Sequence, residues 1–386
     1  MSKVKSGLGL ILAVFVIGAG YLLLAPVPVE PKAWQPQADA GYVGVHKANQ
    51  GLANLNLIDI HGETGPEHIA LGPDGKLYAA VESGKIVRMQ PDGSQFEVWA
   101  DTKGRPLGLD FDAKGRVIVA DAMLGLLAID AQRQIVPLLT KLATDDPIAY
   151  ADAVVVAKNG KIYLSDATRR FAAKQFGGTF NASILDILEH SATGRIIEFD
   201  PATNQARVVM SDLSFANGLA LSSDERSLFV VETGEYRVWK IDIQTQNLSA
   251  KSSAAAPNLL LSNLPGYPDN LMRGRDGRIW LGFTKPRGAA IDNMAQKPWL
   301  RKVTLRLPKS LWPVPKAYGH VIAFQEDGKV VRDLQDPSGV YPETTSVLET
   351  QDRLYIQSLH AHAIGWLPNG ANLAKVSDAS AQVKDK

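Results

Sequence analysis

From about residue 60 onward, apolar and polar positions repeat one pattern: an apolar strand, a tight turn and a second apolar strand. The turns carry Asp-Gly, Asn-Gly or a related polar pair. Such turns favour β-hairpins because they accept the positive φ angles that tight hairpin turns need. The pattern occurs six times, with turns at Asp74–Lys76, Lys114–Arg116, Asn159–Lys161, Asp224–Arg226, Asp276–Arg278 and Gln351–Arg353.

A second pair of apolar strands follows these hairpins, as at Lys85–Met89 with Phe96–Ala100 and at Arg195–Phe199 with Ala206–Met210. Four strands per unit, repeated six times, predict an all-β domain folded as a six-bladed β-propeller. Two stacked sheets or two separate sandwiches are the alternative. We expect Leu55–Ile60 to add a strand to the last blade and so to close the ring.

The N-terminal residues break this pattern. Residues 6–29 carry no charge. The run Gly7–Ala25, at about 1.5 Å per residue, approaches the roughly 30 Å thickness of a membrane's hydrocarbon core. Lys3 and Lys5 precede the run, so we predict an N-terminal transmembrane helix with a cytoplasmic N-terminus. The rest of this single-pass membrane protein would lie on the periplasmic, extracellular or lumenal side. A cleaved signal peptide is the alternative.

The pattern divides the chain into successive parts. We expect a signal-anchor helix over residues 1–29, a Pro-rich spacer over 30–54, the propeller over 55–376 and a polar tail over 377–386.

Charge and cysteine content narrow the function. The chain of 386 residues has 41 Lys and Arg against 40 Asp and Glu, and this balance argues against a nucleic-acid partner. Its lack of cysteine excludes disulfides, thiolate metal sites and a cysteine nucleophile.

Alignment of the six units on their turns brings polar residues to one common position, at the start of each first strand. That position holds Glu67, Leu107, Asp152, Asn217, Asp269 and Thr344. The first strands line the axis, so these side chains are expected to converge at one end of the channel. Neighbouring carboxylates repel one another unless a cation lies between them. Oxygen ligands from Glu67, Asp152, Asn217 and Asp269 suit Ca²⁺ best and Mg²⁺ or Mn²⁺ next. The alternative is that these residues only cap strand starts or pair with backbone amides.

Two long loops, over residues 167–193 and 284–319, leave the second strands on the same face as this ring. Both contain apolar and aromatic residues, and we expect them to roof the site. A membrane-facing or partner-binding patch is their alternative use.

Further polar residues lie near the predicted ring. Asn270 follows Asp269 and is a candidate extra metal ligand or substrate contact. His360 and His362 lie in the corresponding loop of the last unit and are candidate substrate-binding residues or proton shuttles. His68 follows Glu67 and is a candidate proton shuttle. The alternative for each histidine is a surface or packing role.

Two stretches of the chain, Phe215–Glu232 and Leu264–Leu281, resemble the strictosidine synthase-like six-bladed propellers. Within this family, the chain is most similar to the membrane-anchored adipocyte plasma membrane-associated protein branch. The segments that carry this similarity are Ala192–Pro201, Lys297–Val303 and the N-terminal anchor. The wider clan includes gluconolactonases and paraoxonases. The resemblance therefore implies a calcium-dependent esterase or lactonase with its metal at the channel mouth. It places Glu67, Asp152, Asn217 and Asp269 at metal-ligand positions and Asp269 at the proposed general base of gluconolactonases.

One position departs from the plant alkaloid synthases, which use a glutamate near the start of the last blade for amine–aldehyde condensation. Alignment on Arg353–Ile356 puts Thr345 there, while Glu343 and Glu349 are out of register. A threonine cannot act as that base at neutral pH. We therefore do not expect true strictosidine synthase activity.

The leading interpretation is a membrane-anchored, metal-dependent hydrolase of small-molecule esters or lactones, with Asp269 and His68 as catalytic residues. The alternative is a non-catalytic, membrane-tethered propeller that binds a ligand or a protein partner around a structural metal. Both uses are compatible with the predicted fold.

Overall fold

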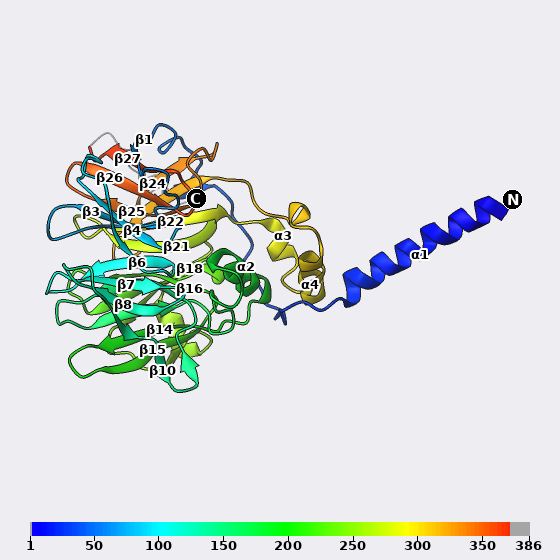
Figure 1. Ribbon diagram of the computed structural model, residues 1–386, viewed down its shortest axis with the longest axis horizontal. Helices are drawn as coiled ribbons and strands as arrows, with labels where there is room; N and C mark the ends of the chain where they lie inside the picture. The colour runs from blue at the N-terminus through cyan, green and yellow to red at the C-terminus, as the bar shows by residue number, and fades with distance from the viewer. Residues whose placement is uncertain (1, 371–386) are drawn as a thin grey trace, which may run out of the picture.

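The computed structural model describes residues 2–370, with side chains from residue 12 onward, and confirms the predicted six-bladed β-propeller (Figure 1). The innermost strands of neighbouring blades contact one another, and the last contacts the first, so they form a closed ring. These strands are β2 (His68–Leu71), β6 (Pro106–Phe111), β12 (Ala151–Val156), β16 (Ala216–Leu221), β21 (Gly266–Arg273) and β25 (Thr344–Glu349).

Each blade continues outward from its inner strand by antiparallel pairing in chain order. Blade 1 adds β3 (Leu77–Ala80), β4 (Lys85–Met89) and β5 (Glu97–Asp101), and blade 2 adds β7 (Val117–Asp121), β8 (Gly125–Ile129) and β9 (Ile135–Leu139). Blade 3 adds β13 (Ile162–Asp166), β14 (Gly194–Asp200) and β15 (Gln205–Leu213), which β19 (Leu248–Ser249) extends in parallel. Blade 4 adds β17 (Ser227–Glu232), β18 (Arg237–Asp242) and β20 (Leu259–Leu261), and blade 5 adds β22 (Ile279–Pro286), β23 (Gly319–Phe324) and β24 (Val330–Asp336).

The last blade closes the ring with a strand from the beginning of the domain. After β26 (Arg353–Ser358) and β27 (Ala363–Pro368), its outermost strand is β1 (Asn56–Asp59), which pairs antiparallel with β27. This pairing confirms the closure predicted from Leu55–Ile60. A separate ribbon of β10 (Lys141–Ala143) and β11 (Asp146–Pro147) lies outside the blades.

The helices lie in the N-terminal segment, in the two long loops and between strands of blade 4. The α-helices are α1 (Ser2–Leu24), α2 (Thr179–Glu189), α3 (Ala289–Asn293) and α4 (Pro298–Arg306), and the short 3-10 helices are η1 (Gly44–His46), η2 (Thr233–Glu235), η3 (Ser253–Asn258) and η4 (Lys309–Leu311). In Figure 1, α2, α3 and α4 all lie on one face of the propeller, the face from which α1 projects.

The hydrophobic core lies between neighbouring blades. One cluster joins Phe229 of blade 4 to Leu281 and Phe324 of blade 5, and the other blade interfaces hold similar clusters. Each sheet therefore packs on both faces, so its strands are apolar nearly throughout and do not alternate. This double packing explains why the sequence shows short continuous apolar runs.

The predicted turns have the backbone that their glycines allow. Gly75, Gly115, Gly160 and Gly277 have φ angles of +76°, +75°, +85° and +75°. In blade 4 the same position is held by Glu225, a non-glycine residue with a φ of 56°. These positive angles confirm the sequence signal for hairpins.

The N-terminal segment differs from its prediction. α1 projects away from the propeller (Figure 1). Many of its described apolar side chains are exposed. The predicted anchor over residues 1–29 includes residues whose side chains are outside the description. Within the part that is described, no helix has the length and apolar character needed to cross a membrane, so the transmembrane prediction is not supported. The predicted polar tail over 377–386 and residues 371–376 lie outside the described residues.

The predicted spacer lies against the propeller. Trp34 stacks on His190 with ring centroids 4.0 Å apart, and Arg287 Nη2 donates to the carbonyl of Gln37. Val29, the last residue of the predicted anchor, is also fully buried. This segment is therefore part of the packed structure.

A buried polar cluster holds the end of this segment to blade 5. Asp333 Oδ2 lies 2.8 Å from His46 Nδ1 and 3.1 Å from His320 Nε2, and Asn49 Nδ2 donates to Asp333 Oδ1 at 3.3 Å. Gln335 Nε2 also donates to Asp333 Oδ1. One carboxylate thus joins residues from both ends of the domain.

Candidate active site

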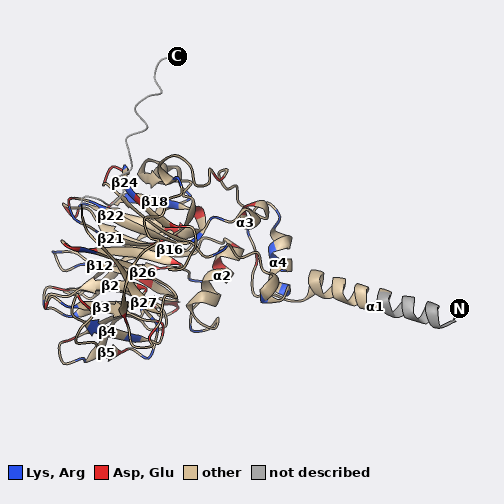
Figure 2. Cartoon of the chain, turned by 90° about the horizontal axis from the view of Figure 1, so that it is seen from above, with Lys and Arg blue, Asp and Glu red and all other residues tan. Residues whose placement is uncertain are grey.

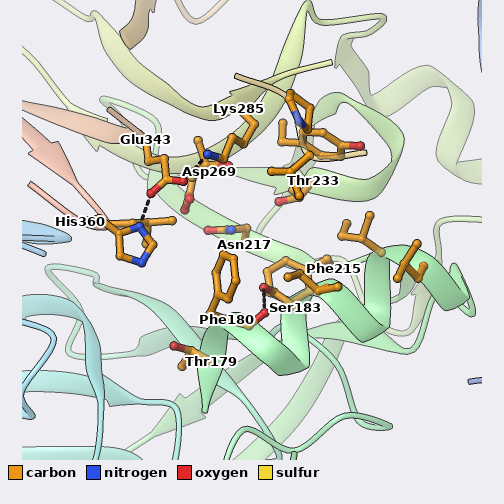
Figure 3. Close-up of a pocket in the computed structure, with 18 of the residues that line it drawn as sticks. Thr179, Phe180, Ser183, Phe215, Asn217, Thr233, Asp269, Lys285, Glu343 and His360 are labelled. Carbon is orange, nitrogen blue, oxygen red and sulfur yellow. Dashed lines mark hydrogen bonds and ion pairs between the residues drawn. The ribbon is translucent and has the colours of Figure 1, made fainter. Parts of the chain in front are cut away.

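A cavity of about 240 Å³ opens at the end of the channel where the inner strands begin. Its floor is acidic, and its walls come from the two long loops and the last blade (Figure 3). The floor residues are Glu67, Asp152, Asn217 and Asp269, four of the six positions that the repeat alignment selects.

The three carboxylates of the floor converge. One oxygen from each of Glu67, Asp152 and Asp269 lies within 4.8 Å of those of the other two. These residues are only 4%, 3% and 6% exposed, so solvent screens the repulsion between their charges poorly. Asn217 is also buried and lines the same floor.

Irregular pairing of the inner strands accompanies this convergence. The registers shift between Ala151 and Val154, between Ala216 and Leu219, and between Pro268 and Leu271. Asp152, Asn217 and Asp269 lie within these three shifts, and a β-bulge redirects side chains next to functional sites. The repeat alignment found the equivalent positions, but the bulges are a tertiary feature.

Glycine lets neighbouring inner strands approach closely beside the floor. A Cβ atom on Gly218 would lie 2.4 Å from the backbone nitrogen of Leu271 and 2.5 Å from the carbonyl oxygen of Asp269. Any larger residue would push β16 away from β21. The Asn217-Gly218 pair therefore combines a polar floor residue with the close contact that positions Asp269.

The electrostatics of the floor favour a bound cation. Burial raises the pKa of Asp152 and of Asp269 well above the usual value. The charge of Asp269 raises the pKa of Asp152 further, and the charge of Glu67 does the same for Asp269. Burial also raises the pKa of Glu67, which Arg105 partly offsets by donating Nη2 to Glu67 Oε2 at 2.6 Å.

Several floor oxygens have no hydrogen-bond donor. Oδ1 of Asp152, of Asn217 and of Asp269 is buried without a partner among the described residues. A buried acceptor without a donor costs free energy unless another group pairs with it. The donor set contains only oxygen, which fits Ca²⁺ and, less well, Mg²⁺ or Mn²⁺. The residues present therefore fit the predicted cation.

A second charged group forms one wall of the cavity. Figure 3 shows Glu343 between Lys285 and His360. Glu343 Oε1 lies 2.5 Å from Lys285 Nζ, and Glu343 Oε2 pairs with His360 Nδ1. Glu343 has a φ of 53°, a left-handed conformation that is strained for a glutamate and that functional sites often retain.

Glu343 and His360 shift each other's protonation. The hydrogen bond to Glu343 is the largest cause that raises the pKa of His360. Burial raises the pKa of Glu343, but the bonds to His360 and Lys285 outweigh it and hold that pKa below its usual range. Glu343 therefore stays ionised and fixes the His360 ring through Nδ1. No partner occupies His360 Nε2 among the described residues.

The other predicted polar residues do not line the cavity. His68 is buried beside the backbone of Leu109, and burial lowers its pKa to about 4. Asn270 is buried with both amide atoms unpaired among the described residues, and His362 is exposed. These positions do not favour the roles predicted for His68 and His362. Asn270 does not line the cavity, but its Oδ1 is a buried acceptor without a donor among the described residues, like Oδ1 of Asp152, Asn217 and Asp269.

The register argument missed Glu343. Thr345, the position aligned with the alkaloid-synthase glutamate, is buried and donates its hydroxyl to the carbonyl of Glu67 at 2.6 Å. Glu343 lines the cavity although it precedes the first residue of β25. The only sequence signal for this role is its place just before an inner strand, as for Glu67.

The long loops roof the cavity, as predicted. Phe180, Ile184 and Ile187 of α2 line one side of the cavity. Trp312 and Val314, which follow α4, line another. Phe180 also makes an edge contact with the His360 ring at a centroid distance of 5.8 Å. The site therefore combines an acidic floor, one charged wall and an apolar roof.

Known structures share this fold. A gluconolactonase from Xanthomonas campestris has a TM-score of 0.56 at 19% identity, covering 89% of this chain and 99% of its own. The calcium-binding protein regucalcin from Agrobacterium tumefaciens has a TM-score of 0.52 at 14% identity, covering 78% of this chain and 85% of its own. At such low identity these similarities show the propeller fold alone.

Sequence comparisons give the family. The models for strictosidine synthase and for the strictosidine synthase-like N-terminal region match residues 152–246 and 44–89. Strictosidine synthase-like protein 6 of Arabidopsis thaliana is 34% identical, covering 81% of this chain and 81% of its own. The adipocyte plasma membrane-associated protein of Danio rerio is 28% identical, covering 86% of this chain and 82% of its own. The chain belongs to the strictosidine synthase-like family.

Proposed function

We propose that this protein is a metal-dependent hydrolase of lactones or carboxylic esters. The observation that carries the proposal is the buried acidic floor, whose carboxylates converge and whose oxygens lack donors, at the base of a substrate-sized cavity. The fold similarity to a gluconolactonase agrees with it without deciding the reaction.

The floor residues would hold the cation, with oxygens of Glu67, Asp152, Asn217 and Asp269 as ligands. A bound Ca²⁺ would polarise the substrate carbonyl and stabilise the oxyanion that forms. Arg105 stays paired with Glu67 and keeps this ligand oriented. The apolar roof excludes water around the reacting group and favours substrates with an uncharged, apolar part.

The charged wall suggests how water is activated. Glu343 holds Nδ1 of His360, which leaves Nε2 free to accept a proton from water. The water oxygen then bonds to the carbonyl carbon, and the C–O bond to the leaving alkoxide breaks. The proton on Nε2 passes to that alkoxide. Asp269, the base predicted from the resemblance, is the alternative acceptor, but it also belongs to the floor that would hold the cation.

Glu343 does not favour the condensation chemistry of the plant alkaloid synthases. Its carboxylate lies in the cavity, which Thr345 at the aligned position cannot supply. However, its bonds to Lys285 and His360 lower its pKa, and a carboxylate held in this way is a weak base. Our proposal therefore remains hydrolysis.

Calcium is expected to stabilise the metal-free protein and to switch on hydrolysis over the same concentration range. At calcium concentrations about a hundredfold above Kd, the gain in unfolding free energy should be about 2.7 kcal/mol. Thermal unfolding and the hydrolysis of an aryl ester and a lactone, each measured with chelator and with added Ca²⁺ or Mg²⁺, test this expectation. Hydrolysis that survives complete chelation would falsify the mechanism. Stabilisation by calcium without any hydrolysis would instead favour the non-catalytic binding propeller.

The pH profile tests His360. Hydrolysis should rise with pH through the pKa of His360, because only the neutral ring accepts a proton from water. That pKa lies above 6.5, first because of Glu343 and then because of the charges of Glu82 and Glu67, while burial opposes them. Glu343→Gln should therefore shift the rising limb to lower pH and lower its plateau. Glu63→Gln, outside the cavity, is the control, and an unmoved limb in Glu343→Gln would remove His360 from the mechanism.

A further inference from the structure

The outer side of the cavity roof carries a local excess of positive charge. Residues 294–320 contain several lysines and arginines and no acidic residue, although the whole chain has a net charge of only +1. Figure 2 shows basic residues on α4 beside the end of α1. Lys297, Lys309 and Lys316 are exposed.

Large apolar side chains are exposed among these lysines. Trp299, Leu311 and Val314 are 57%, 63% and 55% exposed, and Phe180 of the neighbouring α2 is 51% exposed. We call the surface formed by these four residues and by Lys297, Lys309 and Lys316 the lid face. Basic residues alternating with tryptophan and aliphatic side chains are typical of segments that lie on membrane surfaces.

The lid face is joined to the apolar helix α1. Arg306 of α4 donates Nε to the carbonyl of Ala25 at 2.5 Å and Nη1 to the carbonyl of Leu22 at 2.9 Å. Phe15, Ile17 and Leu24 of α1 are 73%, 71% and 82% exposed. Figures 1 and 2 both show α1 leaving the molecule from the side of α4. The exposed apolar side chains of α1 therefore start beside α4, the helix that carries Trp299 of the lid face.

We propose that the lid face docks on the surface of a bilayer that contains anionic lipids, with Leu311 and Val314 inserted among the headgroups. An anionic bilayer matches both features of this surface, since it attracts the lysines and accepts the apolar side chains. An acidic protein would match the charge but would leave the exposed apolar side chains of α1 uncovered. Val314 and Phe180 also line the cavity, so the mouth of the cavity would face the lipid in the docked protein. The proposal does not depend on the hydrolase activity.

Single-cysteine labelling tests the insertion, because the chain has no cysteine of its own. Val314→Cys in the full-length protein would carry an environment-sensitive fluorophore. The matched control is Ala113→Cys, in the β6–β7 turn at the opposite end of the channel. Phosphatidylcholine vesicles with phosphatidylglycerol should increase and blue-shift the emission at residue 314 but not at 113. Vesicle binding without a change at residue 314 would mean that α1 alone holds the protein, and the proposal would be wrong.

Charge reversal tests the electrostatic part. The variant Lys297→Glu/Lys309→Glu/Lys316→Glu should bind anionic vesicles about a hundredfold or more weakly than the unmodified protein. Added salt should weaken the binding of the unmodified protein, because salt screens the attraction between its lysines and the lipid. The control Lys76→Glu/Lys114→Glu/Lys158→Glu makes the same charge change at the turns of blades 1 to 3, and it should retain most of the binding. Equal loss in both variants, or no binding of the unmodified protein to the anionic vesicles, would overturn the proposal.

Discussion

Replacement of Asp269 by asparagine is expected to lower lactone and ester hydrolysis by at least about a thousandfold, because the cation that stabilises the oxyanion loses a charged ligand. The same substitution should abolish stabilisation by calcium. It should also make the metal-free protein more stable, since Asp269 and Glu67 no longer repel each other in a buried floor. Hydrolysis rates and thermal unfolding with and without calcium measure all three effects.

Asp110→Asn is the matched control for Asp269→Asn. Asp110 lies toward the opposite end of the inner strand β6, accepts hydrogen bonds from the backbone of Phe111 and Val156, and has its pKa raised by burial to about 6. The substitution Asp110→Asn should leave both the hydrolysis rate and the stabilisation by calcium unchanged. If Asp269→Asn retained both properties, the acidic floor would not be a metal site.

Replacement of Asp333 by alanine is expected to lower the free energy of unfolding by about 3–5 kcal/mol, the range seen when one member of a buried charged network is removed. The side chains of His46, Asn49, His320 and Gln335 would lose their shared acceptor, and His320 is fully enclosed. Urea unfolding followed by tryptophan fluorescence measures the change. Asp352→Ala, at an exposed turn, is the control and should change stability by less than about 0.5 kcal/mol.

The stabilising effect of Asp333 should depend on pH. Burial alone would raise the pKa of Asp333, but hydrogen bonds from His320 and His46 outweigh burial and hold it well below the usual range. A carboxyl group with a lowered folded-state pKa stabilises the protein above its unfolded value of about 3.9 and loses this effect as pH falls toward the folded value. The stability difference between the unmodified protein and Asp333→Asn should therefore shrink below about pH 4. A difference independent of pH would mean that the ionisation of Asp333 does not make the contribution.

The sequence by itself determined the architecture of this protein. The hairpin signals recur in one register, and the apolar strands can be buried only when each sheet packs on both faces, so the six blades and their closing strand followed from local patterns. The floor residues Glu67, Asp152, Asn217 and Asp269 followed too, because a repeat places equivalent positions at equivalent points around an axis.

Only the tertiary structure decided which other groups share the site. Glu343 and His360 meet because a left-handed residue and a loop from the end of the same blade bring their side chains together, and no spacing rule encodes such a contact. His68 is directed into the packing beside Leu109 although it adjoins a floor residue. The lid face likewise combines Phe180 of α2 with Trp299 of α4 and the segment that follows α4, which are far apart in the chain. Repeats determine positions along an axis, whereas side-chain partners depend on bulges, loops and packing between distant segments.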